Sequence, residues 1–168
     1  MRQRSFGIDA PGQPAPPWTT REWFNTNGAA LQLADLRGQV VVLHAFQMLC
    51  PACVHHGLPQ ALRIAATFAP QGVVVIGLHT VFEHHTAMTP VSLQAFLHEY
   101  RITFAVGVDA PSPDAHNPIP ATMLAYGMQG TPSLLLIDRH GQLRRHTFGA
   151  EDDLALGAAI AQLVVEGG

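Results

Sequence analysis

The chain has 168 residues, of which 48% are apolar and 12% charged, so it can bury one substantial core and is short for two domains. Its formal charge at pH 7 is -3, and its acids and bases are dispersed, which excludes a basic stripe for nucleic acid or an anionic membrane. We therefore expect neither nucleic acid nor a membrane among its partners.

The N-terminal region predicts an extended leader in front of one domain. Its first residues carry charge, but no apolar signal region follows, and no segment approaches the length of a membrane-spanning helix. Residues 10–17 are rich in Pro and Gly, which predicts a poorly packed segment that ends where Trp18 and Trp23 anchor onto the body. We place the leader at 1–17 and the domain at 18–168. The protein is expected in the cytoplasm, or in the periplasm if an export signal has been removed.

The first half of the domain alternates strand and helix patterns. Residues 39–46 form a near-continuous apolar run, typical of a central strand covered on both faces. A helix is expected over 51–68, interrupted near 57–59 because a proline inside a helix removes a hydrogen bond. A second buried strand follows over 73–78, and a helix over 89–100 begins with a Thr-Pro cap.

The second half predicts further strands and a final helix. The expected elements are a strand over 102–108, a Pro-rich loop over 111–120, a helical turn over 123–126, strands over 133–138 and 142–148, and a helix over 151–165. The last two strands flank a turn at 139–141 and form a β-hairpin. Together the two halves indicate an α/β domain.

Cys50 and Cys53 are the only cysteines of the chain and stand in the pattern Cys-Pro-Ala-Cys. They follow a predicted strand and open a predicted helix, so the first sulfur lies at a helix N-terminus, where free backbone N–H groups favour a thiolate. A helix terminus contributes up to about 2 kcal/mol, and one pKa unit corresponds to about 1.36 kcal/mol, which takes the thiolate fraction toward roughly half at neutral pH. The pair therefore indicates a dithiol that transfers electrons, with Cys50 as the attacking sulfur.

Two other interpretations of the cysteines involve no redox chemistry. An inert buried pair is one, and half of a zinc site is the other, although zinc commonly takes four protein ligands and no second Cys-x-x-Cys is present. Imidazoles could complete a copper or zinc site with the two sulfurs, and the candidates are His44, His55, His56 and His79. Ten histidines in a chain of this size make chance neighbours common, so we expect no metal and no other cofactor.

Three separated motifs resemble the redoxin branch of the thioredoxin-like superfamily, which contains TlpA/ResA-type thiol-disulfide oxidoreductases and AhpC/TSA peroxiredoxins. They are Phe46 to Cys53, Tyr126 to Pro132 and Ile137 to Gly141, and the resemblance runs from about Leu31 to Leu163. It implies a thioredoxin fold, in which helices flank a mixed central β-sheet.

The resemblance also implies a set of site residues. The Thr131–Pro132 bond would be cis, and its loop would lie against the two cysteines. The backbone of Gly130 and Thr131 would pair with an extended substrate segment. Glu83 loosely matches a glutamate that relays protons to the thiols in ResA-like proteins, a role that His84 or His85 could fill equally well.

The function implied is thiol-disulfide exchange through a mixed disulfide, with Cys50 as nucleophile and Cys53 as the resolving thiol. Its partners would be a protein or small-molecule disulfide and an external thiol reductant. The alternative is a thiol peroxidase, whose upstream Pro and Thr or Ser are replaced here by Leu43 and Gln47. The arginines that could polarise a peroxide are Arg139, Arg144 and Arg145. A metal-binding or redox-inert thioredoxin-like module is the third possibility.

Overall fold

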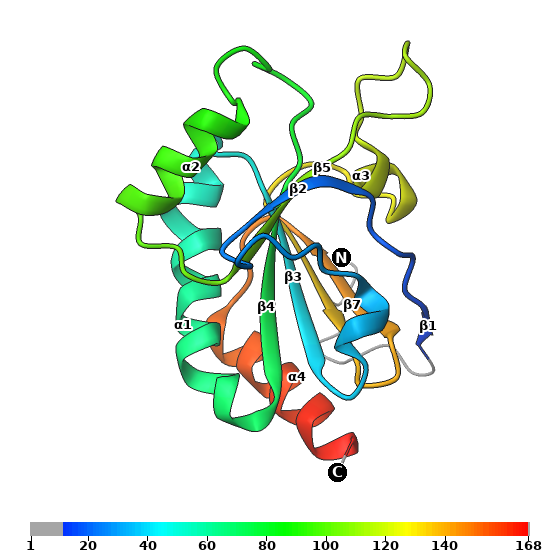
Figure 1. Ribbon diagram of the computed structural model, residues 1–168. Coiled ribbons are helices and arrows are strands. Elements are labelled where there is room, and N and C mark those ends of the chain that lie inside the picture. The colour runs from blue at the N-terminus through cyan, green and yellow to red at the C-terminus, as the bar shows by residue number, and fades with distance from the viewer. Residues whose placement is uncertain (1–11, 168) are drawn as a thin grey trace, which may run out of the picture.

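The computed structural model describes residues 12–167, which form one mixed β-sheet covered by helices on both faces (Figure 1). The strands are β1 (Gln13–Pro14), β2 (Thr20–Phe24), β3 (Val40–Phe46), β4 (Val73–His79), β5 (Ala105–Asp109), β6 (Ser133–Ile137) and β7 (Gln142–Phe148). The helices are α1 (Leu58–Phe68), α2 (Pro90–Glu99), α3 (Ala121–Ala125) and α4 (Asp153–Glu166), with short turns η1 (Leu33–Leu36), η2 (Cys53–Gly57) and η3 (Ala69–Gln71).

The sheet is centred on β3, and its strands lie in the order β1-β7-β6-β3-β4-β5-β2. β3 pairs in parallel with β4 and antiparallel with β6, and all seven of its residues are buried. This burial on both faces explains the near-continuous apolar run in the sequence. The mixed sheet with flanking helices confirms the expected α/β architecture.

Alternation along β3 divides the core between the two faces of the sheet. One face packs against α1, α2 and α4, whereas the other packs against η1, α3 and the segment around Trp18. The β3 side chains with no exposed area include Val40, Val42 and Phe46 on the first face and Leu43 and Ala45 on the second. The cysteines lie at the end of this strand, so a rigid central element holds them.

The helix that follows β3 contains a π-helical turn, η2, which continues directly into α1. The Leu58 N–H donates to the Cys53 carbonyl, five residues back, instead of to the residue four back. Pro59 follows immediately and has no N–H to donate, which favours a local change in the hydrogen-bond ladder. The interruption expected near residues 57–59 therefore exists, and it extends one turn toward the cysteines.

Two edge features differ from the sequence expectations. β5 begins at Ala105, not at residue 102, because the Asn25 side-chain amide donates to the carbonyls of Ile102 and Phe104. β2 was not expected at all, and it pairs antiparallel with β5 as a short strand with exposed charged residues. Such a short, polar edge strand carries little apolar periodicity.

The Pro-rich segment before Trp18 is extended, as expected, but it is tied to the sheet. β1 pairs antiparallel with β7, and the Tyr126 hydroxyl donates to the Pro16 carbonyl at 2.6 Å. Trp18 is buried, and its indole N–H donates to the Leu31 carbonyl at 2.8 Å. The part of the expected leader over residues 1–11 lies outside the described residues. Between residues 12 and 167, no helix has the length and apolar character needed to cross a membrane.

Candidate active site

Cys50 and Cys53 meet where β3 gives way to the helix. Cys50 is partly exposed and Cys53 is buried, with their Sγ atoms 2.6 Å apart. The Cys53 backbone N–H donates to the Cys50 Sγ at 3.3 Å, and the Val54 N–H donates to the Cys50 carbonyl. One backbone N–H at the start of the helix therefore reaches the Cys50 sulfur, consistent with its predicted place at a helix N-terminus.

The two sulfurs differ strongly in their environment. Burial raises the pKa of the Cys53 thiol far above its ordinary value, and its side-chain hydrogen bond with Cys50 raises it further. Cys53 is therefore a protonated thiol at neutral pH. Of the two sulfurs, only that of Cys50 is open to a reaction partner from solvent.

The cis-proline loop approaches the cysteines from the start of β6. The Thr131–Pro132 peptide bond is cis, and the Thr131 carbonyl oxygen lies 3.5 Å from the Cys50 Sγ. Gly130 is buried beside it, and its carbonyl accepts a 2.8 Å hydrogen bond from the Ser133 hydroxyl. A Cβ at Gly130 would lie 2.9 Å from the ring of Phe148. The structure thus brings the Thr131 carbonyl to the Cys50 sulfur, with Pro132 next in the chain and Gly130 one residue before it.

Glu83 reaches the site through Gln47. Glu83 is exposed, and the buried Gln47 side-chain amide donates to its carboxylate at 3.5 Å. The Gln47 side-chain oxygen accepts the Phe82 N–H at 3.3 Å, and its backbone carbonyl accepts the Cys50 N–H at 3.1 Å. Sequence reasoning noted Gln47 only for the peroxidase residue that it replaces. Its place three residues before Cys50 was the available signal for this bridging position.

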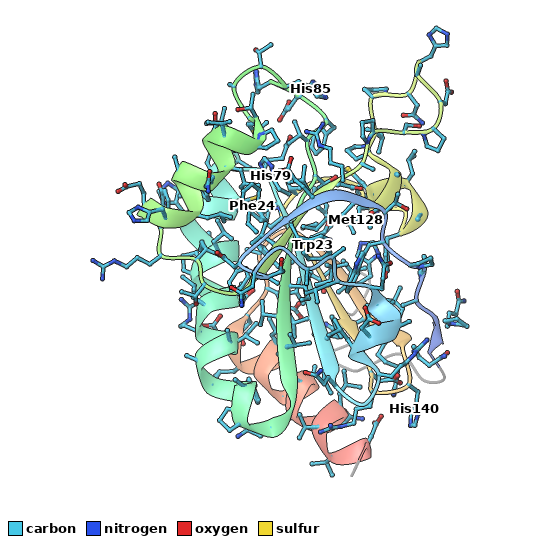
Figure 2. The ribbon with its side chains drawn as sticks, in the orientation of Figure 1. Trp23, Phe24, His79, His85, Met128 and His140 are labelled. Atoms are coloured by element: carbon cyan, nitrogen blue, oxygen red, sulfur yellow. The ribbon has the colours of Figure 1, made fainter. Side chains whose placement is uncertain are left out.

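Two buried histidines flank the site without forming a metal cluster. The His44 ring nitrogens have no hydrogen-bond partner among the described protein atoms, and burial lowers the pKa of His44 to about 4. His79 lies at the end of β4 (Figure 2), and its Nε2 accepts the Met48 N–H at 3.3 Å. Burial lowers its pKa to about 4 as well. His55 and His56 are exposed on the π-helical turn, and residues 12–167 contain no group of three His, Cys, Asp or Glu side chains placed to bind a metal.

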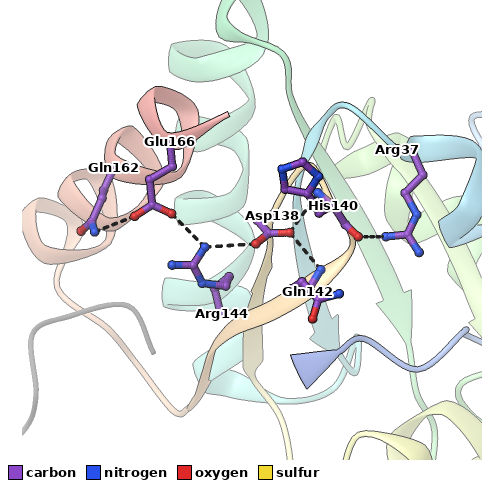
Figure 3. A network of polar contacts seen from close by, with 7 residues as sticks. All are labelled: Arg37, Asp138, His140, Gln142, Arg144, Gln162 and Glu166. Carbon is purple, nitrogen blue, oxygen red and sulfur yellow. Dashed lines mark hydrogen bonds and ion pairs between the residues drawn. The ribbon is translucent and has the colours of Figure 1, made fainter. Parts of the chain in front are cut away.

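The three arginines considered as peroxide ligands have partners away from the cysteines. Figure 3 shows Arg144 in a network with Asp138, which follows β6 at the end opposite the cis-proline loop. The partners are the Gly38 and Gln71 carbonyls for Arg139, the Asp138 and Glu166 carboxylates for Arg144, and the Glu151 carboxylate for Arg145. These guanidinium groups therefore serve contacts that hold the sheet, its turns and α4 together.

Comparisons with known proteins agree with this geometry. The model of the AhpC/TSA family matches residues 11–146. The thiol-disulfide oxidoreductase ResA of Halalkalibacterium halodurans is 26% identical over 129 residues, which cover 76% of this chain. The matched region spans 64% of the length of that ResA.

Solved structures resemble the whole described fold. A crystal structure of a thioredoxin-like superfamily protein has a TM-score of 0.86 and 58% sequence identity, covering 90% of this chain and 96% of that one. A thiol-disulfide isomerase from Corynebacterium glutamicum has a TM-score of 0.81 and 47% identity, covering 89% and 96% of the two chains. The chain therefore belongs to the AhpC/TSA family and has a thioredoxin-like fold with two adjacent cysteines.

Proposed function

We propose that this protein is a thiol-disulfide oxidoreductase in which Cys50 attacks the substrate and Cys53 resolves the intermediate. The observation that carries the proposal is the asymmetry of the pair, because a partly exposed sulfur lies 2.6 Å from a buried one. The relatives named ResA and thiol-disulfide isomerase support the same reaction class.

The reaction consists of two exchanges that conserve thiols and disulfides. The Cys50 thiolate attacks one sulfur of a substrate disulfide, a Cys50–substrate disulfide forms, and the other substrate sulfur leaves as a thiolate that takes up a proton. Cys53 then loses its proton and attacks the Cys50 sulfur, which releases the second substrate thiol. The substrate gains two electrons, and the protein is left with a Cys50–Cys53 disulfide that an external thiol reductant must open.

The raised pKa of Cys53 fits the order of the two exchanges, in which Cys50 reacts first. A buried thiol that stays protonated does not compete with Cys50 for the substrate. Its deprotonation then requires a proton acceptor once the mixed disulfide has formed. We assign the acceptor role to Glu83, whose carboxylate accepts the side-chain N–H of Gln47, three residues before Cys50.

Substrate contacts are proposed on the rim around Cys50. The Thr131 backbone lies beside the sulfur, so an extended segment of the substrate can pair with it during exchange. The flanking surface carries two exposed apolar side chains, Leu49 next to Cys50 and Phe148 against Gly130. This surface suits a protein disulfide presented on an apolar segment better than a highly charged small molecule.

The test compares wild type, Cys53→Ser and Cys50→Ser with a peptide disulfide, in the presence and absence of dithiothreitol, and, separately, with hydrogen peroxide. With dithiothreitol present, we expect rapid disulfide reduction by wild type. With the peptide disulfide alone, added to reduced protein from which dithiothreitol has been removed, we expect a covalent Cys50–peptide adduct in Cys53→Ser by mass spectrometry. Cys50→Ser should show neither. The adduct accumulates because the resolving thiol is missing.

The reaction with hydrogen peroxide can contradict the proposal. Fast, saturable peroxide consumption, with Cys50 trapped as sulfenic acid in Cys53→Ser and slow disulfide turnover, would overturn the proposal in favour of a peroxidase. A peptide adduct on Cys53 in the Cys50→Ser variant, at the wild-type rate, would reverse the assigned roles of the two sulfurs.

A further inference from the structure

A cavity of about 460 Å³ lies at the carboxyl ends of β4 and β5, and His79, which flanks the cysteine site, forms part of its wall. Its walls are the loop between β4 and α2, the loop between β5 and α3, and Arg21 of β2. Figure 2 shows His79 at the end of β4 and His85 on the loop beyond it. The carboxyl edge of parallel strands is a common place for ligands in α/β proteins.

The cavity presents hydrogen-bond donors on an otherwise mostly apolar wall. Val81, Met88 and Val108 line it, together with several prolines. Arg21 also lines it, and the exposed Arg21 side chain has no hydrogen bond or ion pair with any residue between 12 and 167. An unpaired guanidinium beside apolar walls is the arrangement that recognises a carboxylate with a hydrocarbon body.

His79 supplies a second, buried donor. Its Nε2 accepts the Met48 N–H, so in the neutral ring the proton is on Nδ1. The exposed fraction of His79 is 1%, and its Nδ1 has no hydrogen-bond partner among the described residues. The positive charge of Arg21 contributes to the lowered pKa of His79, which indicates that the two side chains lie near each other.

Asp109, the one carboxylate among the residues of the cavity wall, already accepts hydrogen bonds from the protein. Asp109 accepts the Thr122 N–H on Oδ1, at 2.8 Å. It accepts the Thr80 hydroxyl and the Met123 N–H on Oδ2, at 2.9 and 3.1 Å. Asp109 therefore holds the loop after β5 in place, and its hydrogen-bonding capacity is used within the protein.

We propose that this cavity binds an organic carboxylate, with the acid group between Arg21 and His79 Nδ1 and the hydrocarbon part against Val81, Met88 and Val108. The ligand is a free fatty-type acid or the C-terminal carboxylate of a peptide ending in an apolar residue. The inference goes beyond the proposed function and does not depend on the thiol chemistry.

The test titrates hexanoate into the full chain and follows the Met48 amide by NMR, because that N–H donates to His79. Saturable shifts with a millimolar Kd are expected, with hexanol weaker and hexylamine weakest. Arg21→Gln and His79→Gln should each raise the Kd about tenfold, since each removes one hydrogen bond to a charged group. The side-chain oxygen that His79→Gln introduces can still accept the Met48 N–H, so the fold is retained.

Arg101→Gln is the matched control and should leave the Kd unchanged, because Arg101 is also exposed and its side chain has no partner among residues 12–167. A short apolar peptide with a free C-terminus distinguishes the two ligands. If it binds more tightly than hexanoate, the site is for a peptide C-terminus; if it binds more weakly, the site is for free acids. The proposal is wrong if no saturable shift occurs by about 50 mM, where a millimolar site is nearly full. It is also wrong if hexylamine or the amidated peptide binds equally well.

Discussion

His44 is a buried polar side chain that gains no protein hydrogen bond within the described part of the chain. Its exposed fraction is 1%, and its ring lies close to Gly57 of the π-helical turn, which also approaches Pro132 of the cis-proline loop. Burying an imidazole without a partner opposes folding by roughly 1–3 kcal/mol. His44 therefore packs against the π-helical turn that follows the cysteines, and its burial lowers the stability of the protein.

Replacing His44 by leucine should raise the free energy of unfolding by about 1–2 kcal/mol, because an apolar side chain of similar volume removes the desolvation cost. Urea unfolding at pH 7 measures the change. His116→Gln, at an exposed loop position, should change the free energy by less than about 0.5 kcal/mol. A less stable His44→Leu protein would show that the imidazole makes compensating interactions.

At the scale of elements, the π-helical turn η2 depends on a glycine. A Cβ at Gly57 would lie 2.4 Å from the His44 Cε1 and 3.2 Å from the Pro132 Cβ. The helix can therefore approach β3 and the cis-proline loop only where no side chain is present. Gly157 in α4 offers a contrast, because a Cβ there would meet no atom within 4 Å.

Gly57→Ala should lower the free energy of unfolding by about 1–3 kcal/mol, since overpacking outweighs the gain in helix propensity. Gly157→Ala should raise it by about 0.5–1 kcal/mol, because only the propensity gain applies. Thermal and urea unfolding of the two variants measures both effects. Equal stabilisation by the two substitutions would mean that η2 has room for a side chain.

At the scale of the whole molecule, residues 12–167 include two buried neutral histidines, so the stability of the protein depends on pH. The pKa values of His44 and His79 are both lowered from 6.5 to about 4 in the folded protein. Between pH 4 and pH 6.5 the unfolded chain binds more protons than the folded chain does. The free energy of unfolding is therefore not reduced by protonation of either histidine above pH 6.5, and each histidine lowers it as the pH falls toward 4.

We expect the free energy of unfolding to fall between about pH 7 and pH 4 by about 3 kcal/mol for each of the two histidines. Urea unfolding at intervals across this range measures the slope. His44→Leu and His79→Gln should each remove about half of the fall, whereas His116→Gln should leave it unchanged. A wild-type stability that stays constant over this range would contradict neutral burial of both rings.

Much of the fold followed from local patterns in the chain. The runs that form β3, β4 and β6 are apolar because both sides of these strands are covered, and α2 and β7 were expected close to their observed bounds. The strand β2 was not predicted, because a short polar edge strand shows little hydrophobic periodicity in the sequence. The cis geometry at Thr131 came from the family resemblance, not from a local pattern.

The sequence by itself determined the central strands, the helix that follows β3 and the spacing of Cys50 and Cys53, because these features depend on residues close together in the chain. Tertiary structure alone decided that Gln47 joins Cys50 to Glu83 and that Arg21 shares a cavity with His79. The physical reason is that hydrophobic periodicity specifies which residues are buried, whereas sheet order and register decide which distant loops meet.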